Sequence, residues 1–115
     1  MRICYIAGAK SVHTQKWVNY FAQIGHEIHL ISNVIGEGYS REVRFHLLTT
    51  LLSQPQLISG YINSLLWIVQ TRRLVKRIKP DIIDAHYISK YGYLAIASGF
   101  HPVVLTAWGS DILIE

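Results

Sequence analysis

Two short apolar runs near the end of the chain place the tightest constraint on its fold. Residues 82–85 (IIDA) and 103–106 (VVLT) have the length of buried strands, and residues 91–98 between them have helical character, closed by Gly99. Three residues would pack this helix: Leu94, Ile96 and Ala97. A strand, a helix and a second strand form a parallel crossover. In open parallel sheets, ligands bind outside the carboxyl ends of the strands, so we expect a cleft there.

Residues with useful chemistry follow both runs. His86 and Tyr87 come after the first, and Trp108, Gly109 and Asp111 come after the second. Trp108 has an indole face that could stack on a ligand, or it could be a core residue beside Gly109. Asp111 is either a ligand or a charge at a helix start. These five residues are the first candidates for the site.

The chain opens with a further strand and turn. Residues 3–7 (ICYIA) predict a fully buried strand, Gly8-Ala9-Lys10-Ser11 a turn, and residues 13–24 a helix whose core face carries Trp17, Val18, Phe21 and Ile24. The turn lacks the further glycines and the acidic residue of a dinucleotide fingerprint, which disfavours NAD. Backbone N–H groups near Gly8, with Lys10 close by, could receive a phosphate; the alternative is a tight turn that needs glycine.

The second strand contains two histidines, which suggest a metal site, but their spacing argues against one. Gly25 ends the first helix, and residues 26–32 form the strand, with His26 and His29 three positions apart. Side chains at that spacing point to opposite faces of a strand, so we expect no metal site. The loop at 33–40, which holds two glycines, either contributes to the cleft or only connects.

The middle of the chain predicts a short strand at 41–48 and a long helix at 56–79. Residues 47–71 carry no charge, but their polar residues interrupt the run too often for a membrane span. Apolar side chains on one stripe of the helix would be Tyr61, Leu65, Ile68 and Val75, with Leu66, Trp67 and Leu74 off it. Five basic residues lie within the last eight positions of the helix, 72–79. It is either a packed helix with a solvated tip or a surface that touches an anionic membrane.

Strands and helices alternate along residues 1–115, which predicts one α/β domain with a Rossmann-like, mainly parallel open sheet in three αβα layers. The lone Cys4 lies inside a strand, so we expect a buried thiol and a reducing compartment. The chain begins directly with structure, which favours a cytoplasmic location. Ser110 would start a helix that runs out after one turn, so we expect a domain that is incomplete at its C-terminus.

Four pieces of the sequence together resemble one family. HTQKW after the glycine turn, GHEIHLIS, PDIIDAHY and AWGSD occur in the order found in the N-terminal domain of family 4 glycosyltransferases, retaining enzymes of the GT-B architecture. The resemblance covers most of the chain except about residues 33–70. It implies two facing Rossmann-like domains, of which this one mainly receives the acceptor. The other would hold the nucleotide-sugar donor.

The resemblance also implies roles for single residues. Gly8 matches the glycine of the first turn, which approaches the donor diphosphate, with Ala9, Lys10 and His13 beside it; His86 matches a histidine at the strand end and would be catalytic. Trp108 stands where many relatives have a histidine near the transferred sugar, and Asp84 also replaces a frequent histidine. No metal or cofactor is implied.

The expected function is therefore the acceptor-side domain of a glycosyltransferase that moves a sugar from a nucleotide-sugar to a saccharide or lipid-linked acceptor. Alone, the 115-residue piece should be inactive, since nothing in it would stabilise the leaving diphosphate. Two alternatives remain: a non-catalytic subunit that recruits a donor-binding chain to the inner face of the cell membrane, and a nucleotide-sugar epimerase of the same shape. The net charge of +4 fits phosphates or acidic lipids, and no nucleic-acid partner is expected.

Overall fold

The computed structural model describes residues 1–49, 57–86 and 91–106. The elements run β1 (Arg2–Ile6), α1 (Val12–Gln23), β2 (Glu27–Ser32), β3 (Arg44–Leu47), α2 (Leu57–Ile78), β4 (Ile82–His86), α3 (Tyr93–Ala97) and β5 (Val103–Thr106). The helix expected from Ser110 lies outside the described residues. Each described element falls within a few residues of its predicted position.

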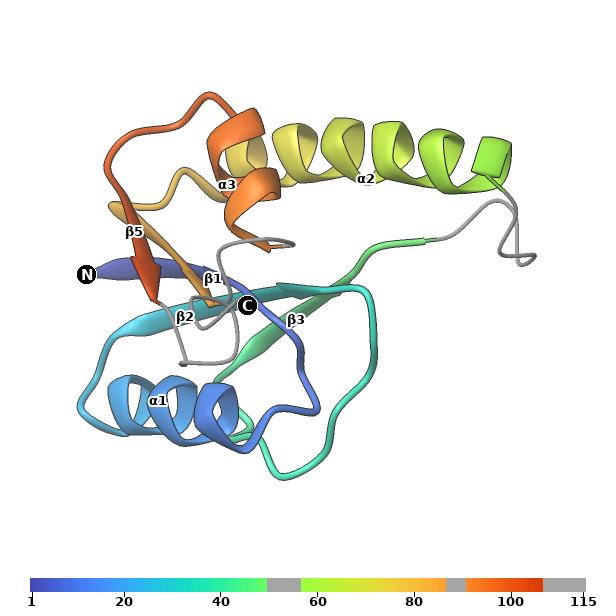
Figure 1. The fold of residues 1–115 in the computed structure, drawn as a ribbon. Coiled ribbons are helices and arrows are strands. Elements are labelled where there is room, and N and C mark those ends of the chain that lie inside the picture. Colours follow the sequence, from blue (N-terminus) through green and yellow to red (C-terminus); the bar gives the residue numbers. More distant parts are fainter. Residues whose placement is uncertain (50–56, 87–90, 107–115) are drawn as a thin grey trace.

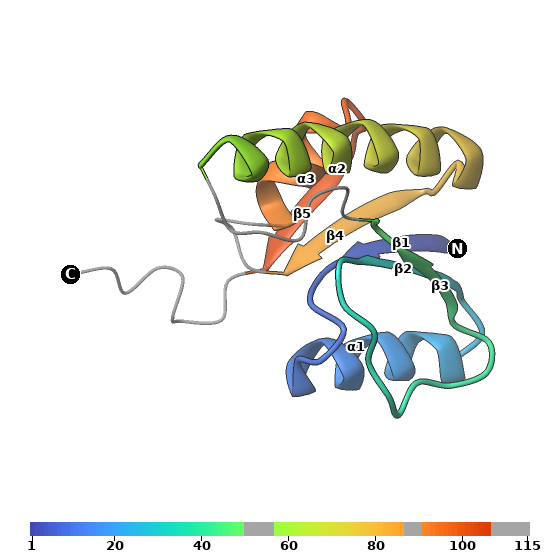
Figure 2. The same ribbon diagram turned by 90° about the vertical axis from the view of Figure 1, so that its right-hand side faces the viewer.

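The described strands form one open sheet in the order β3-β2-β1-β4-β5, and every neighbouring pair is parallel. Helix α1 covers one face, and α2 and α3 cover the other (Figure 1). A view turned by 90° shows the same three layers (Figure 2). The chain is thus an α/β protein with a Rossmann-like open sheet, as the sequence predicts.

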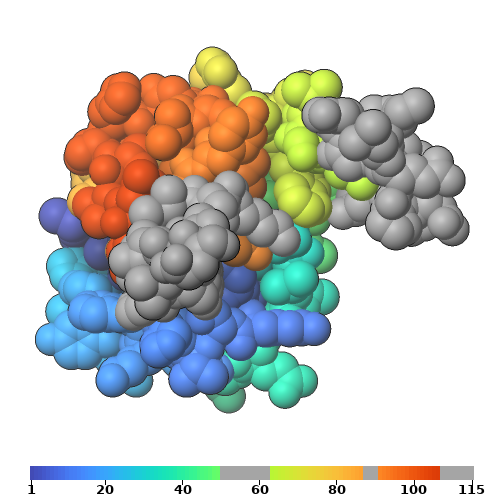
Figure 3. Space-filling model, in the orientation of Figure 1, coloured from blue at the N-terminus to red at the C-terminus, as the bar shows by residue number. Residues whose placement is uncertain are grey.

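Strand β1 is the centre of two apolar cores, one on each face of the sheet. Tyr5 joins Val18 and Leu30 on the α1 side, whereas Cys4 and Ile6 join the core beneath α2 and α3. Alternate residues of a strand point to opposite faces, so one run of apolar residues supplies both cores. Burial raises the pKa of the Cys4 thiol to about 12, which keeps it protonated. In the space-filling view, α1 and the α3–β5 segment occupy opposite sides of the face shown (Figure 3).

Helix α1 is bounded by two well-formed caps. The Ser11 side chain accepts a hydrogen bond from the Thr14 N–H at its start. At its end Gly25 has a φ of 101°, and the N–H groups of Gly25 and His26 donate to the carbonyls of Ala22 and Phe21. This pair of bonds is a Schellman motif, which requires the left-handed conformation that glycine adopts most easily.

The predicted core faces of the helices need correction. On α1 the buried residues are Thr14, Val18 and Ala22, while Trp17 and Ile24 are 44% and 54% exposed. The ring of Trp17 instead stacks on Phe21 along the flank of the helix, with ring centroids 5.9 Å apart. Small side chains let the helix backbone approach the sheet, and the larger aromatic residues then cover its side.

Two predictions for the other helices were also wrong. Leu65 is 64% exposed on α2, whereas Trp67 and Leu74, expected off the stripe, pack with Ile68 against the core. On α3, Ile96 is exposed and Leu94 is buried with Ala95. Gly99 has a φ of 76° after α3, in agreement with its predicted role in ending that helix.

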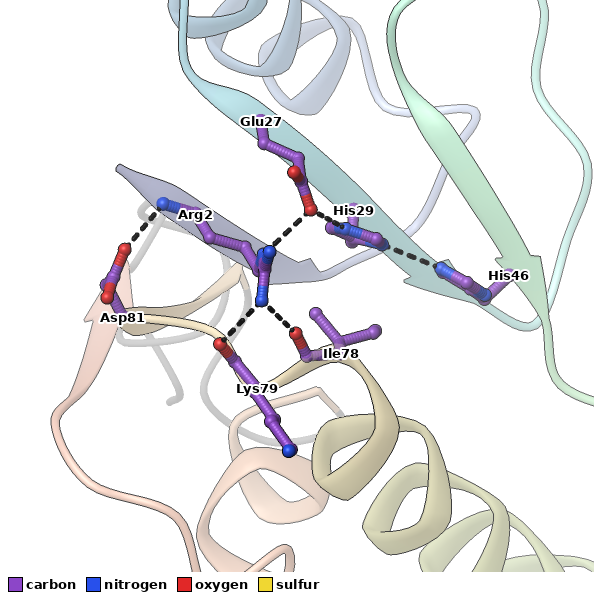
Figure 4. Close-up of polar contacts among 7 residues, drawn as sticks. All are labelled: Arg2, Glu27, His29, His46, Ile78, Lys79 and Asp81. Atoms are coloured by element: carbon purple, nitrogen blue, oxygen red, sulfur yellow. Dashed lines mark hydrogen bonds and ion pairs between the residues drawn. The ribbon is translucent and has the colours of Figure 1, made fainter.

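A chain of polar contacts joins the amino ends of the central strands (Figure 4). The Arg2 guanidinium donates to Glu27 at 2.7 Å and to the Ile78 and Lys79 carbonyls at the end of α2. A cation at this position satisfies helix-end carbonyls and complements the helix dipole. On the other side of Glu27, the ring nitrogens of His29 lie 2.7 Å from its carboxylate and 3.0 Å from His46 Nε2.

The two histidines are sensitive to protonation. Their rings are stacked, 5.2 Å apart and tilted by 13°. A carboxylate only accepts, so His29 Nε2–H donates to Glu27, and this bond lowers the pKa of Glu27. If both histidines were charged, the two nitrogens that face one another would both be donors and the bond between the rings would be lost. Burial lowers the pKa of His46, and its positive neighbours lower it further.

This lowered pKa predicts a loss of stability in mild acid. As the pH falls below about 6.5, the unfolded chain binds a proton at His46 before the folded chain does, so the free energy of unfolding decreases towards the folded-state pKa. Above that pH the contribution is fully present. Urea unfolding across this range should show a shallower pH dependence for His46→Gln than for the wild type. Equal slopes in the two proteins would contradict the expectation.

Candidate functional site

The carboxyl ends of β1 and β4 lie next to one another at one edge of the sheet. Ile6 pairs with Ala85, and therefore the Ala7–Gly8 turn leaves the sheet beside His86. The two residues are far apart in sequence, and parallel pairing alone brings them together. The structure thus places Gly8 and His86 at neighbouring strand ends, as the sequence predicts.

The turn after β1 is held by side chains from the β2–β3 region. The Ala9 N–H donates to Ser32 Oγ at 3.1 Å, and the Tyr39 hydroxyl donates to the Ala9 carbonyl at 2.6 Å. Burial raises the pKa of Tyr39 to about 12, so its hydroxyl keeps the proton for this bond. Gly36 approaches so closely that a Cβ there would lie 2.2 Å from the Ala9 carbonyl oxygen. The loop at 33–40 therefore supports the turn directly.

Some backbone N–H groups of the predicted phosphate site are already used in hydrogen bonds within the protein. The N–H groups of Ala9 and Ser11 are already used, the second by the Gly8 carbonyl at 3.1 Å. An anion at this turn would instead meet the N–H groups of Gly8 and Lys10 and those of the first turn of α1. A Cβ on Gly8 would lie 3.2 Å from the Tyr91 hydroxyl, which donates to Asn33 Oδ1 at 2.7 Å. Tyr91 thus closes one side of the turn.

A hollow of about 350 Å³ opens on the other side of the turn. Its lining combines the turn, α1 and the following loop: Ala9, Lys10, Gln15, Ile35, Gly36 and Glu37. Lys10 is exposed here, and the Gln15 amide donates to the Glu37 carbonyl oxygen. One cation, one carboxylate and an amide beside a small apolar wall can hydrogen-bond a polyhydroxylated ligand as well as an anion.

His86 is buried at this edge, with 1% of its surface exposed. Its Nδ1 shares a hydrogen bond of 3.0 Å with the hydroxyl of Thr14, on the first turn of α1. Its Nε2 lies 3.7 Å from Asp84 Oδ2, and Asp84 accepts a bond from the Thr106 hydroxyl of β5 at 2.9 Å. The Tyr5 ring packs edge-on against the imidazole at 5.3 Å. The imidazole therefore links α1, β4 and β5.

Burial and the charge of Asp84 raise the pKa of Tyr5, so this phenol stays neutral beside the imidazole. The Thr14 hydroxyl is fully buried, which excludes it as a nucleophile in this conformation. The arrangement fixes where α1 starts relative to β4. It does not present a ring nitrogen of His86 to solvent.

The remaining candidates divide into two groups. His13 is exposed on the first turn of α1, near Lys10. Tyr87, Trp108, Gly109 and Asp111 lie outside the described residues, so their proposed roles stay predictions. Sequence reasoning missed Thr14, Ser32, Tyr39 and Tyr91, which hold the turn and His86. Of these four residues, only Ser32 could have been suspected from the sequence, because it stands at the tip of a predicted strand. All four have partners in distant segments of the chain.

A larger hollow, of about 430 Å³, lies at the opposite edge of the sheet and is lined by residues that include Arg2, Glu27 and Asp81. These charges are already paired with one another or with backbone groups. It is also remote from the strand carboxyl ends, where open parallel sheets bind ligands. We therefore assign the candidate site to the Gly8 edge.

Within residues 1–49, 57–86 and 91–106, no cluster of three histidine, cysteine or acidic side chains is placed to hold a metal ion. None of the helices in the part of the chain that the structure describes is both long and apolar enough to cross a membrane.

Comparison with known families identifies the chain. The family described as glycosyl transferase 4-like matches residues 2–115, which is nearly the whole sequence. The chain therefore belongs to this family, and the resemblance drawn from its four sequence pieces is confirmed. No curated protein is similar enough to count as a relative.

Solved structures support the fold. Two crystal structures of the C-terminal domain of a hydrogenase from Pyrococcus furiosus align with TM-scores of 0.60 and 0.58, at 13% and 12% identity. They cover 92% and 93% of this chain and 89% and 90% of theirs. At such identity the likeness shows the fold alone. A UDP-galactose 4-epimerase aligns at a TM-score of 0.48 and 13% identity, over 85% of this chain and 48% of its own, which carries no argument for an epimerase.

The Thr14 to His86 bond can be tested by stability. Thr14→Val keeps the shape but removes the hydroxyl, which leaves His86 Nδ1 without this partner in a buried position. We expect a loss of about 1–3 kcal/mol in the free energy of unfolding, measured with urea. Thr14→Ser keeps the hydroxyl and should lose less. If Thr14→Ser were the more damaging variant, packing of the methyl group would matter more than the bond.

Proposed function

We propose that this chain is the acceptor-side domain of a retaining glycosyltransferase, which moves a sugar from a nucleotide-sugar to a saccharide or lipid-linked acceptor. The observation that carries the proposal is the match to the glycosyl transferase 4-like family over residues 2–115. A second domain would hold most of the donor, and this chain would face it with the Gly8 edge of the sheet. Neither the donor nucleotide nor the sugar is assigned.

The geometry of the Gly8 edge supports this role. The Ala9 carbonyl and N–H are already bonded, and the turn leads directly into the start of α1, where an anion is favoured. A donor diphosphate that approaches Gly8 would find the N–H groups of that helix start and Lys10. The hollow beside Gln15 and Glu37 offers amide and carboxylate groups for acceptor hydroxyls. Tyr87, Trp108, Gly109 and Asp111 would complete the edge.

For His86, burial favours a role in positioning. Its imidazole is bonded to Thr14 and lies against Tyr5, so it acts on the reaction by fixing the start of α1, which carries His13 and follows directly after Lys10. Direct contact with the sugar, which the family resemblance implies, requires Nε2 to become accessible when the domains close. The two roles make different predictions for Thr14.

The test uses the complete transferase that the proposal requires. His86→Ala should lower kcat about tenfold to a thousandfold, the range for one lost polar contact at a reacting centre. If His86 only positions the turn, Thr14→Val should reproduce most of this loss. If it contacts the sugar, Thr14→Val should leave kcat nearly unchanged.

His29→Ala is the matched control, because it removes another buried histidine, one that is bonded to Glu27 and His46 and not to the Gly8 turn. Its kcat should stay near the wild-type value when corrected for the folded fraction by circular dichroism. Equal losses in His86→Ala and His29→Ala would argue against any special role of His86.

We also propose that an anionic membrane surface is a partner, through α2. Leu65 and Val69 are 64% and 45% exposed on one side of the helix, and the next turns on that side carry Arg72 and Lys76. Among the described residues, the basic residues at the end of α2 form no ion pair with an acidic side chain. Apolar side chains followed by basic ones suit the interface of a lipid bilayer. This surface would serve either the transferase or a recruiting subunit.

Co-sedimentation with liposomes tests the surface. Each basic residue near an anionic membrane contributes about 1 kcal/mol, so binding should fade as salt rises. Arg72→Gln with Lys76→Gln should weaken binding to vesicles that contain phosphatidylglycerol, and Leu65→Gln should weaken it at all salt concentrations. Lys16→Gln on α1 is the control and should change little. Equal binding to neutral and anionic vesicles would contradict the proposal.

A further inference from the structure

A groove between β3 and the second half of α2 is not used by the proposed transferase site. It is a hollow of about 260 Å³, and its lining is cationic, amide or apolar: His46, Leu47, Gln70, Arg73, Leu74 and Arg77. Arg73 and Arg77 are four residues apart, which places both on one face of the helix. No carboxylate contributes to this lining among the described residues.

The nearest acid does not neutralise the groove. The Glu27 carboxylate receives Arg2 at 2.7 Å and His29 at 2.7 Å, so its charge is already shared between two donors. His29 stands between this carboxylate and His46. Arg73 and Arg77 form no ion pair with a described residue. Positive charge on this wall is therefore uncompensated by the part of the chain that the structure describes.

The far wall of the groove is held in place by backbone contacts. The Gln70 amide accepts from the Thr49 N–H at 2.9 Å and donates to the Thr49 carbonyl at 3.0 Å. This pair of bonds ties α2 to the end of β3 and fixes the width of the groove. Fixed donors and acceptors lose less entropy on binding a ligand than mobile ones do.

His46 reports on the charge in the groove. Three groups interact electrostatically with its ring: Arg44 on its own strand, Arg77 on α2 and His29 on β2, which is bonded to Glu27. These positive neighbours oppose protonation, in addition to the burial of the ring. An anion between them would reverse that effect and make the proton on His46 easier to bind.

We propose that this groove binds a phosphate group, held by the guanidinium groups of Arg73 and Arg77 and by the imidazole of His46. Guanidinium forks bond two oxygens of a tetrahedral anion at once, which favours phosphate over a spherical anion. The volume exceeds that of one phosphate, and Leu47 and Leu74 offer an apolar wall for the group attached to it. The phosphate belongs either to a small soluble molecule or to a lipid headgroup.

This site does not depend on the proposed transferase function. His46 joins the groove to the polar network of Arg2, Glu27 and His29 (Figure 4), and no residue of the groove lines the hollow beside Gly8. Phosphate binding and protonation of His46 would be coupled, so that each favours the other by the same factor. The ligand would then bind more tightly as the pH falls towards the pKa of His46.

The probe is inorganic phosphate, titrated against the 115-residue chain at constant ionic strength while the His46 ring protons are followed by NMR. We expect saturable binding and a rise in the pKa of His46. Arg73→Gln and Arg77→Gln should each weaken binding about tenfold, the loss expected for one charge-assisted hydrogen bond. Lys16→Gln removes the same charge from α1, outside this groove, and should change binding less than twofold. All three positions are exposed, so the variants should fold.

A second arm replaces phosphate with vesicles of phosphatidylglycerol and with neutral vesicles. A His46 response to the anionic vesicles alone, lost in Arg73→Gln and Arg77→Gln, assigns the site to a headgroup phosphate. Equal losses in Lys16→Gln and Arg73→Gln would show only a diffuse field and overturn the proposal. So would a His46 pKa that neither phosphate nor vesicles change, or one that chloride changes equally.

Discussion

The pairing of β1 with both β2 and β4 is the interaction on which the rest of the structure depends. β1 is buried on both faces, so its four apolar residues, Ile3 to Ile6, supply both apolar cores and pair with both neighbouring strands. Since parallel strands run in one direction, their carboxyl ends must collect at one edge. The turn at Gly8 and the end of β4 at His86 are therefore neighbours because of the sheet, and no local feature of either segment is needed to bring them together.

The same sheet explains how much could be predicted from the sequence. Apolar runs and two glycines were sufficient to predict where the helices and strands lie. Gly25 and Gly99 both have a positive φ at helix ends, as their positions in the sequence indicate. The faces of the helices were less predictable. Thr14 reads as polar, yet it is fully buried because its hydroxyl meets His86, and Trp17 reads as core, yet it covers the flank. Hydrophobicity alone does not record such a polar partner.

Contacts between distant segments were beyond sequence reasoning. His29 and His46 stack because the register of β3 against β2 puts them on one face, and the prediction of a strand at 41–48 did not include that register. Tyr91 reaches Asn33 because β2 and β4 are parallel members of one sheet, so the segments that follow their carboxyl ends lie at the same edge. In each case the sequence shows a polar residue near a strand end, and the partner follows from topology. The family match fixes the class of protein but does not supply these pairs.

The two edges of the sheet differ in how their polar groups are used. At the Gly8 edge, Ser32 and Tyr39 bind the Ala9 N–H and carbonyl before any ligand arrives, which removes two backbone groups from the turn and fixes the rest. A ligand there meets N–H groups whose ordering has already occurred during folding, so less entropy is lost on binding. At the other edge, Arg2 caps α2 and holds Glu27, and that carboxylate orients His29 and, through it, His46. Buried polar pairs thus order both regions, but the cations are arranged differently: Lys10 is the single cation in the lining of the hollow at the Gly8 turn, whereas Arg73 and Arg77 lie together on one face of α2 beside His46, which is why the two regions favour different ligands.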